Sequence, residues 1–108
     1  MRILSTILAS ALILVPRIAC AVELGDPQQG LAYARQVCAE CHAVEAGDDL
    51  SPNPDAPSFE GVANTPGMNA RALVVWLQSP HPTMPHLMIP PDETDNVVAY
   101  ITSLRAKK

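Results

Sequence analysis

Apolar residues show their clearest helical period near the end of the chain. Four of them recur at the i, i+3, i+4 and i+7 spacing of a single helix face: Val97, Tyr100, Ile101 and Leu104. Acidic residues come just before this run and an arginine follows it, which matches the helix macrodipole. The pattern predicts an amphipathic helix over residues 92–105.

Two earlier segments also carry helical signals. Asp26 and Pro27 form a typical N-cap and first helical position, and they predict a helix over residues 27–37 with one apolar face. The run over residues 69–78 is apolar around much of its circumference, which suits a helix enclosed on more than one side. Pro80 ends this run.

The connecting segments hold most of the eleven prolines of the chain. Residues 44–65 contain three of them among Asp, Asn, Gly and Ser, and they predict an irregular loop with a solvated acidic surface. Residues 80–91 contain five, which excludes a helix or a central strand there. We therefore predict an all-α domain of three main helices with long proline-rich loops, and loops of such length usually enclose something or act directly in function.

The first 21 residues differ from the rest of the chain. Arg2 precedes an apolar run over residues 3–15, which is shorter than the ~20 residues that span a bilayer. Ala19-Cys20-Ala21 then has the small-x-small form of a signal peptidase site. We expect residues 1–21 to be a signal peptide that exports the protein to the periplasm, and residues 22–108 to form one domain.

Two other interpretations of this segment stay open, namely an uncleaved anchor and a lipoprotein site at Cys20, where Arg17 replaces the usual aliphatic residue. Cleavage removes two of the seven basic residues, Arg2 and Arg17, and none of the eleven acidic ones, so the formal charge changes from −4 to −6. An acidic domain of this kind is unsuited to nucleic acid or anionic lipid. We expect a monomer without stable membrane insertion.

The mature chain has few large apolar side chains with which to form a hydrophobic core. It would have roughly 87 residues, a size at which a domain that relies on its own apolar surface is marginal. Its aromatic residues are one Trp, two Tyr and one Phe. A large, flat, apolar cofactor would complete such a core.

The strongest chemical signal is Cys38-Ala39-Glu40-Cys41-His42, because C-x-x-C-H is the motif of covalent haem attachment. Two thiols three positions apart at the end of a helix can reach both vinyl groups on one edge of a porphyrin. The adjacent His42 then supplies the proximal iron ligand. We expect one haem c (iron) per chain, bound through Cys38 and Cys41 and ligated by His42.

Other uses of this cysteine pair have less support. A zinc site would need a second pair of ligands, and no cysteine follows Cys41. A thioredoxin-like redox pair would need a βαβ setting, which the chain does not indicate. A plain disulfide would leave His42 without a role.

Together with two further features, this motif resembles the class I c-type cytochromes over about Gly25 to Arg105. Gly30 precedes Cys38 by eight positions, Met84-Pro85 forms a Met-Pro pair, and the last helix carries Tyr100. The resemblance implies a cytochrome c-like fold, in which Gly30 lets the first helix cross the last one closely near Tyr100.

The resemblance also implies that the carbonyl of Pro57 lies against Nδ1 of His42. One position departs from the family, which often has an aromatic residue where this chain has Ala34. Trp76 either packs beside the porphyrin or is an ordinary core residue.

The distal iron ligand is expected to be Met84, which lies in the stiff proline-rich segment. Met88 is the nearest competitor. His81 and His86 bracket Met84, and either one as ligand would lower the reduction potential. An open sixth position would instead permit small ligands to bind.

Ligation by His42 and Met84 would saturate the iron and predicts an electron carrier, not an enzyme. The alternatives are a haem enzyme or ligand sensor with a labile distal site, and a cytochrome subunit of a periplasmic dehydrogenase. The partners would be redox proteins. The acidic chain lacks a lysine-rich face, so we expect a basic partner or a brief apolar contact.

Overall fold

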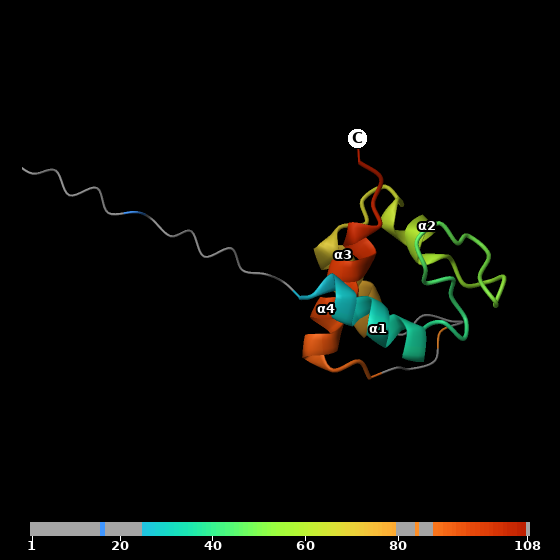
Figure 1. Cartoon of the computed structure of the whole chain (residues 1–108), viewed down its shortest axis with the longest axis horizontal. Coiled ribbons are helices and arrows are strands. Elements are labelled where there is room, and N and C mark those ends of the chain that lie inside the picture. The colour runs from blue at the N-terminus through green and yellow to red at the C-terminus, as the bar shows by residue number, and fades with distance from the viewer. Residues whose placement is uncertain (1–15, 17–24, 80–83, 85–87, 108) are drawn as a thin grey trace, which may run out of the picture.

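The protein is described by a computed structural model that covers residues 16, 25–79, 84 and 88–107 of the 108. The described residues contain four helices and no strand (Figure 1): α1 (Pro27–Val37), α2 (Phe59–Ala63), α3 (Ala70–Gln78) and α4 (Pro91–Ser103). The predicted all-α class is therefore confirmed for this part of the chain. The expected signal peptide, except Pro16, lies outside the described residues.

Helix α1 begins and ends where the sequence indicates. The carboxylate of Asp26 accepts a hydrogen bond from the backbone N–H of Gln28 at 2.8 Å, and Pro27 takes the first helical position. The helix ends at Cys38, whose N–H donates to the carbonyl oxygen of Ala34. The first cysteine of the motif is thus the C-cap of α1.

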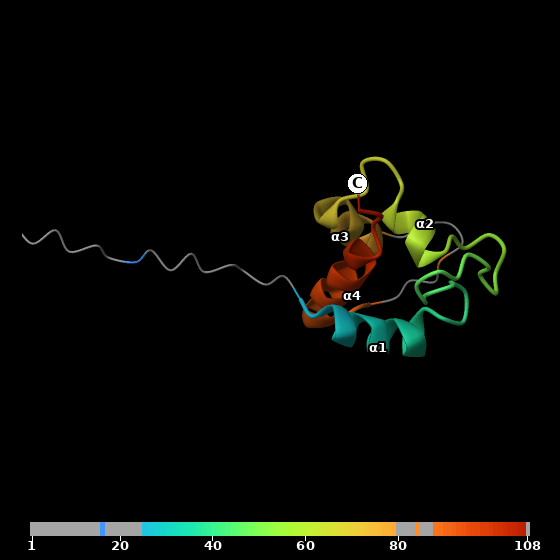
Figure 2. The ribbon, with the colours of Figure 1, turned by 45° about the horizontal axis from the view of Figure 1, so that its top comes forward.

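Helices α1 and α4 cross closely, as both ribbon views show (Figures 1 and 2). The contact depends on Gly30, because a methyl group there would overlap the carbonyl oxygen of Asn96 and lie 2.8 Å from Cβ of Tyr100. The predicted close crossing at Gly30 and Tyr100 is confirmed. Ala34, one turn further on, is completely buried, so a small residue takes the place of the aromatic one.

The core lies between the crossed pair and the shorter helices. Among the described residues one cluster of buried side chains forms it: Ala34, Cys38, Val44, Phe59, Ala63, Leu73, Val97, Val98, Tyr100 and Ile101. The apolar face predicted for α4 is confirmed, since Val97, Tyr100 and Ile101 are all buried. Arg105 follows the helix end, where its guanidinium donates to the carbonyl oxygens of Ala63 and Met68.

Two expectations about the elements were wrong. Helix α3 is not enclosed on several sides, because within the described residues α4 is the helix that packs against it. Leu73 is its buried residue, whereas the side chains of Val75 and Trp76 are 57% and 52% exposed. The interpretation of Trp76 as an ordinary core residue is therefore wrong.

The second error concerns the loop over residues 44–65, which contains the short helix α2. The hydroxyl of Ser58 caps this helix by accepting a hydrogen bond from the N–H of Gly61. Five residues are too few for a helical period to appear in the sequence, and the nearby prolines favour the prediction of a loop over that of a capped helix.

No helix in the described ranges is long and apolar enough to cross a membrane.

Candidate functional site

A cavity of ≈ 410 Å³ lies between the end of α1, the loop that follows it and helices α2, α3 and α4. Its walls are mainly apolar, and they include Val37, Phe59, Leu73 and Ile101. The volume is within the roughly 300–1,000 Å³ of typical ligand sites, which combine apolar walls with a few placed polar groups. The cavity is therefore suited to a ligand that is itself largely apolar.

The cysteine motif forms one side of this cavity. Cys38, Cys41 and His42 all line it. The N–H groups of Cys41 and His42 donate to the carbonyl oxygen of Cys38 at 3.2 and 2.9 Å, so the motif is a tight turn that extends the end of α1. The two cysteines are free thiols, and no disulfide joins them.

The environment of Cys38 is unlike that of a reactive redox cysteine. Its side chain is buried, and burial raises the pKa of the Cys38 thiol to about 11 because the thiolate is poorly solvated there. Reactive dithiols instead have a lowered pKa and an electropositive, accessible setting. The geometry thus disfavours a thioredoxin-like use of the pair.

The imidazole of His42 is fixed in orientation by two neighbours. Its Nδ1 lies 2.6 Å from the carbonyl oxygen of Pro57, which confirms the contact implied by the family resemblance. A carbonyl oxygen can only accept, so Nδ1 is the donor in this contact, and in the neutral imidazole this leaves the lone pair on Nε2. The ring of Phe59 packs against the imidazole with centroids 5.5 Å apart. His42 is therefore prepared to act as a ligand through Nε2.

Backbone contacts on the C-terminal side of His42 hold this arrangement in place. The N–H of Ala43 donates to the hydroxyl of Ser51 at 3.0 Å, and the N–H of Phe59 donates to the carbonyl oxygen of Ala43 at 2.9 Å. The Tyr100 hydroxyl donates to the carbonyl oxygen of Val44 at 2.5 Å. Helix α4 thus supports the motif through the residues that follow it.

An exposed ion pair fastens the same segment to α1. The Nε and Nη2 atoms of the Arg35 guanidinium donate to the Glu45 carboxylate at 2.5 and 3.0 Å. The hydrogen bond from Arg35 lowers the pKa of Glu45. Such pairs contribute little to stability in solvent, but a two-point contact does restrict orientation.

The two methionines of the proline-rich segment differ in position. Met84 is half-buried and lines the cavity, although it is far from the cysteine motif in sequence. Met88 is 86% exposed and does not line it. Two further ligand candidates, His81 and His86, lie outside the described residues.

Several residues at this site were missed in the sequence. Phe59, one of the few aromatic residues, lines the cavity, and Asp55 lines it too, although Asp55 is exposed as the predicted solvated loop requires. The signal for Phe59 was weak, because it depends on α2. Asp55 stands two residues before Pro57, whose expected contact with His42 could have placed it near the site.

Trp76 also lines the cavity, although the residue is 52% exposed. Among the described residues no group of three or more His, Cys, Asp or Glu side chains is arranged to hold a metal ion by itself.

Comparisons with protein-family models, with curated proteins and with solved structures gave no match to this chain.

Proposed function

We propose that the chain is a monohaem c-type cytochrome of the periplasm that carries single electrons between redox proteins. One observation carries the proposal: both cysteines of the motif, its histidine and the distant Met84 line the same apolar cavity. If the C-x-x-C-H motif occurred by chance, its side chains would not be expected to line the same cavity as the thioether of Met84, which comes from another segment.

The residues of the cavity fit haem c in their chemistry. Cys38 and Cys41 offer two neighbouring thiols at the end of a helix, as two thioether bonds to one porphyrin edge require. The contact of Nδ1 with Pro57 leaves Nε2 of the neutral His42 imidazole available to bind iron, and Met84 offers a second axial ligand of the type that raises the reduction potential. Bound haem c would supply a reversible Fe(III)/Fe(II) couple.

The protein's own contribution is to hold and shield the cofactor. The contacts of His42 with Pro57 and Phe59 fix the plane of its ring, so the ligand does not need to reorient when the charge of the site changes. Apolar walls such as Leu73 and Ile101 exclude water, which limits solvent reorganisation. A rigid, dry site of this kind suits electron transfer.

The experiment is to purify the protein from the periplasm and measure its mass, N-terminus and absorbance. We expect a chain that starts near Val22, a mass increased by one haem, and a reduced spectrum that carbon monoxide does not change. A carbon monoxide complex of the native protein would support a ligand sensor or haem enzyme instead. Colourless protein with the mass of the bare polypeptide would contradict the proposal.

A further inference from the structure

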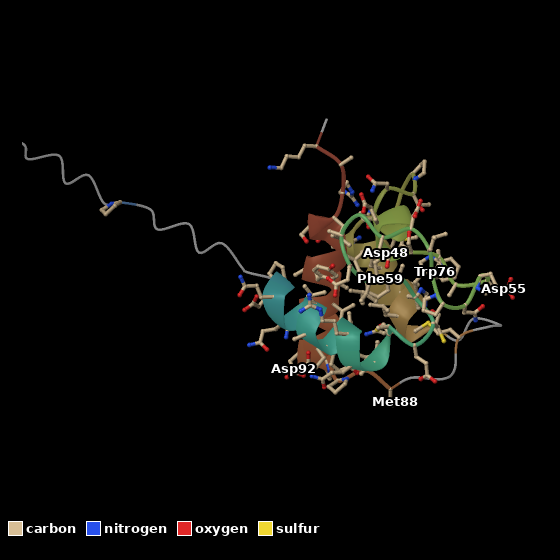
Figure 3. The ribbon with its side chains drawn as sticks, turned by 45° about the vertical axis from the view of Figure 1, so that its right-hand side comes forward. Asp48, Asp55, Phe59, Trp76, Met88 and Asp92 are labelled. Atoms are coloured by element: carbon tan, nitrogen blue, oxygen red, sulfur yellow. The ribbon has the colours of Figure 1, made fainter. Side chains whose placement is uncertain are left out.

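The rim of the cavity combines an exposed aromatic side chain with negative charge. Trp76 of α3 is 52% exposed, and the exposed residues Glu40 and Asp55 line the same opening. Figure 3 shows Trp76 and Asp55 on one side of the molecule. We refer to Glu40, Asp55 and Trp76 as the rim.

Positive charge is absent from this part of the described structure. No Lys or Arg is among the described residues that line the cavity. Arg35 is paired with Glu45, and Arg105 donates to carbonyl oxygens near α2. The described cavity lining therefore combines two carboxylates with an indole ring and contains no Lys or Arg side chain.

We propose that the rim is the docking surface for a redox protein whose contact face carries Lys or Arg side chains around an apolar centre. This inference rests on the proposed function, because the rim surrounds the opening through which electrons would enter and leave. Exposed Trp is among the residues that contribute most to binding, and charges at the edge of an interface mainly accelerate association.

Charge complementarity selects this partner over two others. A second copy of the chain would place Glu40 and Asp55 against the same carboxylates, and like charges across an interface are costly. An anionic lipid surface would be repelled for the same reason. A basic protein gains from both the carboxylates and the indole ring. The contact would be transient and sensitive to salt.

The first test uses two small redox reagents of opposite charge. Stopped-flow experiments would follow reduction of the ferric protein by hexaammineruthenium(II) and oxidation of the ferrous protein by ferricyanide, both at low ionic strength. The rim variant is Glu40→Gln with Asp55→Asn. The control is Asp92→Asn with Asp95→Asn, which removes the same charge from exposed positions of α4, and Figure 3 shows Asp92 well apart from Asp55.

We expect the rim variant to slow the cationic reagent by about three- to tenfold and to accelerate the anionic one, since local charge controls such association rates. The control should change either rate by less than about twofold. Equal effects of the two variants would overturn the proposal, because net charge alone would then explain them. The absorbance spectrum of each variant must match that of the native protein.

A second test needs no variant. The native protein labelled with ¹⁵N would be titrated with a short peptide of lysines around three leucines, and with a glutamate peptide of the same length. We expect the lysine peptide to shift the indole N–H signal of Trp76 and the amide signals of Glu40 and Asp55, and the glutamate peptide to shift none. Shifts confined to other residues would overturn the docking surface.

The two proposals fail in different ways. Native protein without haem contradicts the electron carrier itself, and its mass and spectrum report this before any kinetic measurement. Haem-loaded protein whose rim variant behaves like the control contradicts the docking surface alone.

Discussion

At the scale of single residues, the two methionines give the sharpest test of the site. Met84 lines the cavity and Met88 points into solvent. If the thioether of Met84 ligates iron, its removal takes away the ligand that raises the reduction potential.

We therefore expect Met84→Ala to lower the potential by on the order of 100 mV, a modest part of the ~0.8 V range that axial ligands span. The variant should also bind carbon monoxide, because the sixth position becomes open. Potentiometric titration and the reduced spectrum measure the two effects. Met88→Ala is the matched control and should change neither. An unchanged potential in Met84→Ala would transfer the role to Met88, His81 or His86.

At the scale of elements, the crossing of α1 and α4 depends on the missing side chain of Gly30. Its neighbours there are the backbone of Asn96 and Cβ of Tyr100, and neither can move away without a shift of the whole helix. Overlap with a backbone atom puts the cost of overpacking at about 3 kcal/mol, and alanine regains ~1 kcal/mol in helix propensity, so we expect Gly30→Ala to lower the free energy of unfolding by about 2 kcal/mol. Guanidinium unfolding of the haem-loaded protein, followed by circular dichroism, measures this change.

The control for Gly30→Ala is Gln29→Ala, at an exposed position of the same helix. It should be neutral or slightly stabilising, since alanine favours helix and no contact is lost. If Gly30→Ala proved as stable as this control, the two helices would not be in close contact.

A second contact between elements joins α4 to the segment after His42. The Tyr100 hydroxyl donates to the carbonyl oxygen of the buried Val44. Tyr100→Phe leaves this acceptor without its donor in an apolar setting, which costs about 1–3 kcal/mol. We expect that loss in the free energy of unfolding, and a much smaller one for Tyr33→Phe, because Tyr33 is partly exposed. Equal values for the two variants would show that the Val44 carbonyl finds another donor.

These elements also show which features of the fold could be predicted from the sequence and which could not. The bounds of α1 follow from Asp26 and Pro27, and the buried face of α4 follows from its period, because both signals are local. The exposure of Trp76 could not be predicted, since it depends on which helices pack against α3. The position of Asp55 was missed for the same reason: the fold of the loop, not its composition, brings it to the cavity.

At the scale of the whole molecule, the core contains few large side chains, and Phe59 and Tyr100 are its buried aromatic residues. The largest completely buried residues of the described part are Ile101 and Val97, and a cavity of ≈ 410 Å³ remains beside them. Protein interiors are normally close-packed, and a domain of this size has little stability to spare. We therefore expect the domain to gain stability when the cavity is filled, as the tethered cofactor proposed above would do.

This dependence leads to a prediction about the two cysteines. Cys38→Ser together with Cys41→Ser removes both covalent attachments, so we expect no stable haem-loaded protein and a periplasmic yield at least about tenfold lower, since the emptied fold is exposed to proteolysis. Immunoblots of periplasmic extracts and circular dichroism of any recovered chain measure this. Cys20→Ser is the control, because that residue belongs to the expected signal peptide, and it should leave yield and haem content unchanged. A haem-free double variant that accumulates normally, with native helicity and cooperative unfolding, would contradict the view that the cofactor completes the core.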